Sequence, residues 1–349
     1  MDLEIHFDGG FLIMIEIREC CVTFTSPEGA AYLIGDFTDW DERPLPIPEP
    51  VTIEFPEGAY VEYAFLDANK RPMTDPTNPR RPKNPWYDSH RSMTLPHNCF
   101  KAPPQLETFR GSVQEHVLDS QFLEGQRTYY VYDPPVSPSV TLYVQDGKAF
   151  YRKLRMHEVA EAMIEQGVIA PVRLVFIEPH DRSVEYWFNE RYEAFLLEEV
   201  LPAVDRRYGA TRERGLWGAS LGGMVSAWLA WKNAEVFTKV GSQSGCFTAD
   251  PEGGNEYHDP EWLTEQFLRS ARRPLRLYVE TGQIEWLLAP NRRFAAMLVD
   301  KGYPQSYQEM PGGHNWETWE QGLQPGLRYL FGCSQKKAGP EQPREGEVS

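Results

Sequence analysis

The stretch Arg214-Gly215-Leu216-Trp217-Gly218-Ala219-Ser220-Leu221-Gly222-Gly223 decides the fold. A strand-like run leads into Gly-Ala-Ser-Leu-Gly-Gly, and a helix-like run follows over residues 224–232. The pattern is G-x-S-x-G, in which a serine occupies a sharp, strained turn between a strand and a helix. Small residues on both sides leave room for the chain to reverse. We therefore predict an α/β-hydrolase fold in which Ser220 is the nucleophile, and a packed glycine-rich turn is the alternative.

A serine nucleophile needs a base, and the base needs a third group that orients it. In this fold the chain order is serine, acid, histidine, and only His258 and His314 follow Ser220. His314 lies in a Gly-Gly loop before the last predicted helix, whereas His258 lies in an acidic, glycine-bearing stretch. We predict that His314 is the base, with a surface or helix-capping histidine as the alternative.

The acid of the triad should lie just beyond the strand predicted for residues 275–279. Glu280 at the strand end and Glu285 in the following loop both qualify. We favour Glu285 because a triad acid usually falls in this loop, and Glu280 would then be a strand-end carboxylate facing solvent. The acid would hold the His314 tautomer and stabilise the imidazolium.

Two backbone N–H groups are candidates for the oxyanion hole. That of Leu221 lies at the predicted helix N-terminus, where a developing negative charge is favoured. The second should come from the loop after an earlier strand, and we select Lys148 in Asp-Gly-Lys, with a simple Asp-Gly turn as the alternative. The predicted chemistry is acyl transfer, which requires neither a metal nor an organic cofactor.

Strands and helices alternate from Gly111 onward, which predicts a mostly parallel sheet covered on both faces. The expected strands span 113–119, 128–132, 140–144, 172–177, 214–218, 237–242, 275–280 and 306–309, and the expected helices span 156–166, 184–208, 224–232, 291–301 and 316–330.

The N-terminal part has a different pattern. Short β-rich runs over 21–24, 31–34, 51–55 and 60–66 are separated by Pro and Gly turns, which predicts a small immunoglobulin-like β-sandwich. We expect a sandwich over 1–100, a linker over 101–110, the hydrolase domain over 111–334 and a disordered tail over 335–349.

The formal net charge of -16 argues against nucleic acid and anionic membranes as partners, because both would be repelled. No run of 18 apolar residues is present, and the first residues lack the basic region of a signal peptide. The five scattered cysteines suggest reduced thiols. We expect a cytoplasmic protein that binds a small-molecule ester, and a monomer and a homodimer both stay open.

The hydrolase half resembles the esterase family related to enterochelin esterase and esterase D. The likeness is carried by motifs along most of that half: residues 143–147, the R-x-x-E-Y segment 182–186, the helix segment 198–202, the serine turn 218–223, Gln243-Ser244-Gly245, and Gly313-His314-Asn315-Trp316 with Trp319. In this family a carboxylate after the strand near Glu285 completes the triad.

The segment Gly35-Asp36-Phe37-Thr38-Asp39-Trp40 resembles the G-x-F-x-x-W segment of early-set sandwich domains, which precede the hydrolase in enterochelin esterases. Trp40 is a candidate for stacking on a sugar or an aromatic substrate, with burial in the sandwich core as the alternative. Arg182 is a candidate substrate ligand at a strand end, with an ion pair to Glu185 as the alternative. Trp316 is a third candidate for a residue that binds the substrate.

The resemblance implies a serine carboxylic ester hydrolase that acts on a siderophore ester or a similar small ester. Two alternatives stay open. One is an acetyl or feruloyl esterase acting on carbohydrate, and the other is a glucan-binding module with an inactive hydrolase half.

Overall fold

A computed structural model of the chain describes residues 14–84, 88–253 and 261–333. Its larger part is built on an eight-stranded sheet in the order β16-β15-β14-β13-β11-β12-β10-β9. Strands β11 to β16 run parallel to one another, and β10 is antiparallel to both β9 and β12. The strands are β9 (Ser112–Asp119), β10 (Gln126–Asp133), β11 (Val140–Val144), β12 (Val172–Ile177), β13 (Glu213–Ala219), β14 (Lys239–Gln243), β15 (Arg276–Gly282) and β16 (Gln305–Met310).

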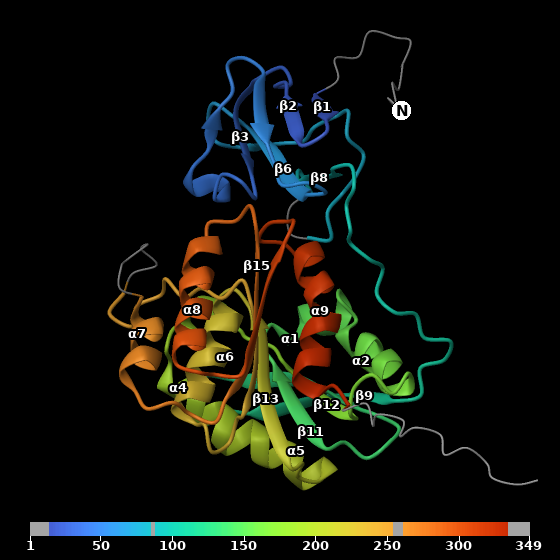
Figure 1. Ribbon diagram of the computed structural model, residues 1–349, viewed down its shortest axis with the longest axis vertical. Coiled ribbons are helices and arrows are strands. Elements are labelled where there is room, and N and C mark those ends of the chain that lie inside the picture. The colour runs from blue at the N-terminus through green and yellow to red at the C-terminus, as the bar shows by residue number, and fades with distance from the viewer. Residues whose placement is uncertain (1–13, 85–87, 254–260, 334–349) are drawn as a thin grey trace, which may run out of the picture.

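Helices cover both faces of this sheet (Figure 1). One face packs against α1 (Gly147–Arg152), α2 (Met156–Glu165) and α9 (Trp316–Phe331), and the other against α4 (Glu190–Ala194), the π-helical turn η2 (Phe195–Val200), α5 (Leu201–Tyr208), α6 (Leu221–Lys232), α7 (Trp262–Arg269) and α8 (Leu288–Asp300). Successive side chains of the central strands alternate between these two layers, so that Tyr143 joins one core and Leu142 and Val144 the other. The predicted α/β class and the mostly parallel sheet are confirmed.

The N-terminal region is all β, also as predicted. Sheet β1-β2-β5 faces sheet β4-β3-β6-β7, with β8 paired to β6. Its strands are β1 (Ile15–Arg18), β2 (Cys21–Phe24), β3 (Ala30–Gly35), β4 (Leu45–Pro46), β5 (Val51–Glu54), β6 (Tyr60–Asp67), β7 (Pro72–Met73) and β8 (Arg91–Thr94), with the short 3₁₀ turn η1 (Trp40–Glu42). A core around Phe24, Tyr63 and Phe65 fills the space between the sheets.

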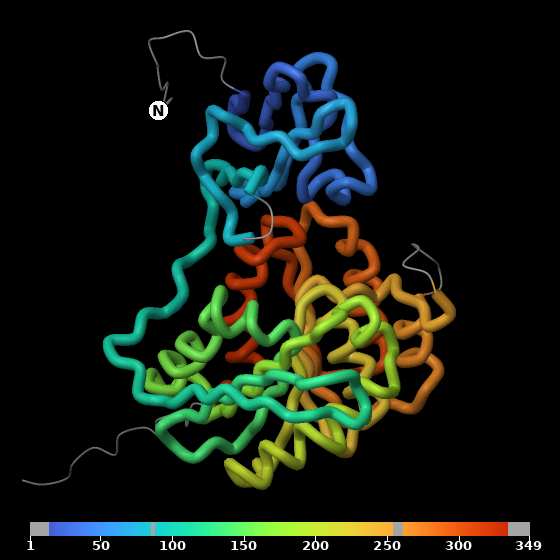
Figure 2. Tube along the Cα trace, turned by 180° about the vertical axis from the view of Figure 1, so that it is seen from behind, coloured from blue at the N-terminus to red at the C-terminus, as the bar shows by residue number. Residues whose placement is uncertain are grey.

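This sandwich lies over the end of the large sheet at which β15 and β16 finish and α8 and α9 begin (Figure 1). The backbone N–H of Tyr60 donates to the carbonyl of Pro311 at 2.9 Å, and Ile284 packs against the sandwich core. Residues 95–111, all of them described, contain no helix or strand and run down the side of the molecule toward β9 (Figure 2). The domain limits at 100, 111 and 334 stay predictions.

The helix predicted over 184–208 is wrong in its first part. A short helix, α3 (Arg182–Glu185), ends there, and Phe188 has a positive φ of 49°. The next helix begins at Glu190, where the Asn189 side chain accepts from the N–H of Arg191. The short helices α1 and α7 were not predicted, because six to eight residues give little periodicity.

Two expectations fall on residues outside the described ranges: the tail over 335–349, and His258 as the weaker histidine candidate. Within residues 14–84, 88–253 and 261–333, no helix combines the length and the apolar character that crossing a bilayer requires.

The carboxylate of Glu185 is buried between α3 and β10. It accepts from the guanidinium of Arg127 and from the backbone N–H groups of His180 and Asp181, both at 3.1 Å. Because removing one partner leaves the other charge buried, we expect Glu185→Ala to cost about 3–5 kcal/mol in the free energy of unfolding. Urea unfolding followed by circular dichroism measures this cost.

The matched control is Glu16→Ala, which removes an ion pair whose Arg18 and Glu16 side chains are 79% and 55% exposed. It should leave the unfolding midpoint nearly unchanged. Equal effects of the two substitutions would contradict the importance assigned to the buried pair.

Candidate active site

Ser220 sits at the turn between β13 and α6 with φ 58° and ψ −124°, a conformation that costs energy for a residue with a Cβ. The turn is tight because a Cβ on Gly218 would lie 2.4 Å from the carbonyl oxygen of Gly222. The Ser220 N–H donates to Gln243 at 2.8 Å, and its carbonyl accepts from Cys246 at 3.1 Å. The neighbouring strand thus holds the strained serine in place.

His314 and Glu285 are in direct contact. Nδ1 of His314 lies 2.6 Å from Oε2 of Glu285, whose side chain is fully buried. The other carboxylate oxygen accepts from the Gly282 N–H at 2.9 Å and from the Thr281 hydroxyl. Burial alone would raise the pKa of Glu285, but the charge and hydrogen bond of His314 and the hydrogen bond from Thr281 outweigh it, so the pKa is lowered. The contact therefore favours an ionised carboxylate beside the imidazole.

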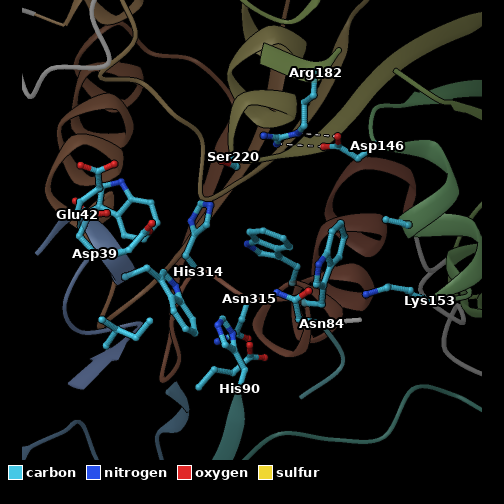
Figure 3. A pocket seen from close by; sticks show the side chains of 18 of the residues that line it. Asp39, Glu42, Asn84, His90, Asp146, Lys153, Arg182, Ser220, His314 and Asn315 are labelled. Carbon is cyan, nitrogen blue, oxygen red and sulfur yellow. Dashed lines mark hydrogen bonds and ion pairs between the residues drawn. The ribbon is translucent and has the colours of Figure 1, made fainter. Parts of the chain in front are cut away.

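Two indole rings fix the orientation of the imidazole. Trp286 lies 4.6 Å from it, centroid to centroid, and Trp319 packs edge-on at 5.0 Å. The Trp319 Nε1–H is itself held by the Ser244 hydroxyl at 3.0 Å. In Figure 3 the ring of His314 points toward Ser220, and both residues line a cavity of about 1330 Å³.

Glu280 does not face solvent, so that expectation is wrong. It is fully buried, and its carboxylate accepts from Gln243 at 2.6 Å and from the Tyr278 hydroxyl at 2.5 Å. Burial raises the pKa of Glu280 to about 8. These partners differ from those of Glu285, so the structure brings Glu285, and not Glu280, to the histidine.

The two predicted oxyanion donors have different environments. Leu221 is the first residue of α6, in the turn whose N–H groups have no acceptor within the helix. The Lys148 N–H, by contrast, donates to Oε2 of Glu178 at 2.8 Å, so it is already engaged in this structure. A substrate oxygen could use this donor only by displacing the Glu178 carboxylate.

Arg182 makes other contacts than those expected. Its Nε donates to Oδ1 of Asp146 at 2.8 Å (Figure 3), and one terminal nitrogen donates to the carbonyl of Ala219 at 2.9 Å. The alternative of an ion pair with Glu185 is wrong, because Glu185 pairs with Arg127. Arg182 therefore ties the Asp146 loop to the residue just before Ser220, which its position in the R-x-x-E-Y segment gave no reason to expect.

The candidate tryptophans both reach the cavity. Trp40 is only half buried and lies outside the main sandwich core, stacked on His90 at 4.2 Å with an interplanar angle of 9°. Its φ of 53° is a strained value for a bulky residue. Trp316 is buried and packs edge-on against Trp319 at 4.8 Å. Trp40 also packs against a small sandwich cluster of Ile34, Ala64 and Leu66, so the core position proposed as the alternative is met only in part.

A family model described as "Putative esterase" matches residues 120–330, well over half of the chain. The chain belongs to this esterase family. It is therefore an ester-hydrolysing enzyme, as the sequence motifs predicted. One curated relative, the uncharacterized protein YbbA of Bacillus subtilis, is 29% identical over 162 residues, which cover 40% of this chain and only 62% of that protein.

Solved esterases share the fold of this family member. The enterochelin esterase of Shigella flexneri superposes with a TM-score of 0.70 at 18% identity, covering 90% of this chain and 94% of that one. The ferric enterobactin esterase of Salmonella typhimurium gives 0.69 at 16% identity, with 89% and 93% covered. A ferulic acid esterase of Anaeromyces mucronatus gives 0.52 at 14% identity and covers 66% of this chain and 94% of its own.

Replacing Arg182 of this esterase with methionine separates positioning from substrate binding. Loss of its contacts to Asp146 and Ala219 should lower kcat on p-nitrophenyl acetate about 10- to 100-fold while KM changes little, because the serine turn shifts. Steady-state kinetics measures both constants.

The control is Arg292→Met, which removes an ion pair with Glu309. The Arg292 side chain is 56% exposed and does not line the cavity. An Arg182→Met enzyme with a raised KM and an unchanged kcat would instead identify a substrate ligand.

Proposed function

We propose that this chain is a serine carboxylesterase in which Ser220 is the nucleophile, His314 the general base and Glu285 the residue that orients the base. The observation that carries the proposal is the 2.6 Å contact between Glu285 and His314 beside the strained serine turn. His314 and Ser220 line one cavity, so an ester bound there meets both groups. The chain order of the three residues also matches this fold.

In the proposed reaction, Oγ of Ser220 attacks the ester carbonyl carbon while Nε2 of His314 takes the hydroxyl proton. The Leu221 N–H supports the oxyanion at the N-terminus of α6. When the carbon–oxygen bond breaks, His314 returns the proton to the departing alcohol and leaves an acyl-serine. Water then attacks the acyl carbon while His314 takes its proton, the bond to Oγ breaks, His314 returns the proton to Oγ of Ser220, and the free acid leaves.

Variants of the three residues test this assignment. We expect Ser220→Ala to lower turnover of p-nitrophenyl acetate by about 10⁴-fold or more, and Glu285→Gln by about 10²-fold or more, because the imidazole loses its orienting charge. A fluorophosphonate should label Ser220 in the unmodified enzyme, located by peptide mass spectrometry.

The matched control is Glu280→Gln. Glu280 has a pKa of about 8 and is mostly neutral at pH 7, so a carboxamide should preserve turnover within about threefold. Full activity of Ser220→Ala would reject the nucleophile, and loss of activity in Glu280→Gln with retention in Glu285→Gln would reject the acid.

For the substrate, we propose a siderophore ester or a similar small ester that carries an aromatic acid. Four tryptophans line the cavity, Trp40 from the sandwich and Trp286, Trp316 and Trp319 from the hydrolase part, which suits planar aromatic groups. The enterobactin esterases match about nine tenths of this chain, sandwich included, and one of them was crystallised in the presence of 2,3-dihydroxy-N-benzoyl-glycine.

Local positive charge supports an anionic substrate despite the net charge of -16. The hydrolase side of the cavity carries Lys148, Arg152 and Lys153 against Glu178, and Arg182 there is paired with Asp146. Burial lowers the pKa of Lys153 to about 8, which leaves it mostly charged at neutral pH. Acidic residues line the sandwich side, among them Asp41 and Glu42, so an anionic group is expected to lie on the hydrolase side.

A feruloyl ester on a carbohydrate is the second candidate substrate. The observation that favours it is the aromatic cavity together with the ferulic acid esterases among the similar structures, which match about two thirds of this chain. The alternative of a glucan-binding module with an inactive hydrolase half is not proposed, since the chain belongs to an esterase family.

Substrate preference is tested by product release from a catecholate trilactone with and without ferric iron, a feruloyl sugar, an acetylated glucan and p-nitrophenyl acetate, with Ser220→Ala as the blank. We expect the trilactone to be the best substrate. Lys153→Met should raise KM for the trilactone about tenfold, because about that much affinity is lost with one charge-assisted hydrogen bond. It should leave KM for p-nitrophenyl acetate nearly unchanged.

Lys301→Met is the control, because this lysine bonds the carbonyls of Leu268 and Ser270 away from the cavity. Preferential turnover of the feruloyl sugar would select the second candidate instead.

A further inference from the structure

The loop that carries His314 is held from two sides. On one side, Glu285 holds the imidazole at Nδ1. On the other side lies the N-terminal sandwich, whose Tyr60 N–H donates to the Pro311 carbonyl at 2.9 Å. The sandwich therefore contacts the backbone that leads to His314, and it also lines the cavity.

One side chain of the sandwich reaches the loop directly. Oδ2 of Asp36, in the turn after β3, accepts from the Asn315 side-chain amide at 2.9 Å and from the Glu62 N–H at 2.8 Å. Asp36 is completely buried and Asn315 is 3% exposed, so water does not replace this bond when it is lost. Asp36 therefore links strand β6 of the sandwich to the residue next to His314.

Asn315 has a second role in the hydrolase part. Its Oδ1 accepts from the N–H of Thr318 at 2.9 Å and from the Thr318 hydroxyl at 3.0 Å, and so caps α9. The oxygen of this side chain is thus committed to the helix and its nitrogen to the sandwich. The residue after His314 is fixed between two elements that are far apart in the sequence.

The two residues before His314 are glycines, which restrict the backbone little. Gly313 lies directly against Asp36, since a Cβ at Gly313 would come within 2.2 Å of Asp36 Cγ. The hydrolase part holds this loop through the Ile284 N–H, which donates to the Gly312 carbonyl at 3.2 Å, and the packing of Asp36 against Gly313 adds a restraint from the sandwich. Glu285 cannot supply it, because its contact is with the ring and not with the backbone.

We propose that Asp36 is a positioning residue for His314, so that the N-terminal sandwich is part of the catalytic apparatus in addition to forming a wall of the cavity. The inference rests on the proposed role of His314 as the base. It predicts that a sandwich residue controls the rate of the chemical step even for an ester that is too small to need contacts with the sandwich.

The experiment compares Asp36→Ala and Asp36→Asn in the full chain with p-nitrophenyl acetate, well below the unfolding temperature of each variant. We expect Asp36→Ala to lower kcat about 10- to 100-fold with KM within threefold, because a small displacement of the base is costly. Asp36→Asn keeps the acceptor oxygen and should stay within about threefold of the unmodified enzyme. Burial raises the pKa of Asp36 well above its ordinary value, which makes a neutral carboxamide a close replacement.

The matched control is Asp75→Ala. Asp75 is an equally buried sandwich carboxylate, but its partners are the Tyr63 hydroxyl at 2.6 Å and Thr77, away from the histidine loop. It should lower the unfolding temperature and leave kcat unchanged. A purely structural Asp36 would behave like Asp75, so a kcat of Asp36→Ala within twofold of the unmodified enzyme, or an equal loss in Asp75→Ala, overturns the proposal.

A second variant covers the case in which Asp36→Ala does not fold. Asn315→Ser keeps an oxygen that can cap α9 but removes the side-chain amide that reaches Asp36, and it should give the same loss of kcat. Retained kcat in this variant would also reject the proposal. Ser220→Ala is measured alongside: if it remains active, the proposed function fails, whereas an inactive Ser220→Ala with an active Asp36→Ala rejects only the positioning role.

Discussion

The strained backbone at Ser220 is the constraint on which the rest of the site depends. Its positive φ is maintained because β13 is central in the sheet, because Gly218 and Gly222 allow the chain to cross itself, and because Gln243 of β14 holds the serine N–H. A serine in this turn projects from the carboxyl end of a parallel sheet, where the loops after the neighbouring strands also meet. The loops that follow β11, β14, β15 and β16 therefore converge on one point, and Glu285 and His314 come from two of them.

Two buried carboxylates only five residues apart show how environment assigns roles. Burial raises the pKa of Glu285, but the neighbouring imidazole and the Thr281 hydroxyl outweigh it, so the pKa is lowered and the carboxylate stays charged. Glu280 is equally buried but faces neutral groups, Tyr278 and Gln243, so that desolvation dominates and its pKa rises to about 8. The physical difference is the presence of a group that can carry positive charge, and it decides which of the two carboxylates can stabilise an imidazolium.

The sandwich changes what the hydrolase part can enclose. With it in place, the cavity has a second wall that carries Trp40 stacked on His90, and the histidine loop packs against Asp36 and Tyr60. Similar structures that match only about two thirds of this chain also have the hydrolase fold. The fold of that part thus occurs without a matching sandwich, and the added contacts concern the shape of the cavity and the placement of His314.

The sequence by itself determined the α/β class, the all-β N-terminal region, most central strands and the candidates Ser220, His314 and Glu285. These predictions rest on patterns within the sequence itself. They are the G-x-S-x-G turn, the continuous apolar strands and the order of serine, acid and histidine along the chain. Only the tertiary structure decided which of two glutamates meets the histidine, that Arg182 pairs with Asp146, and that the Lys148 N–H is engaged by Glu178. The reason is physical: hydrogen-bond partners and burial depend on which loops converge in space, and residues 36 and 315 lie 279 positions apart in the chain yet share a bond of 2.9 Å.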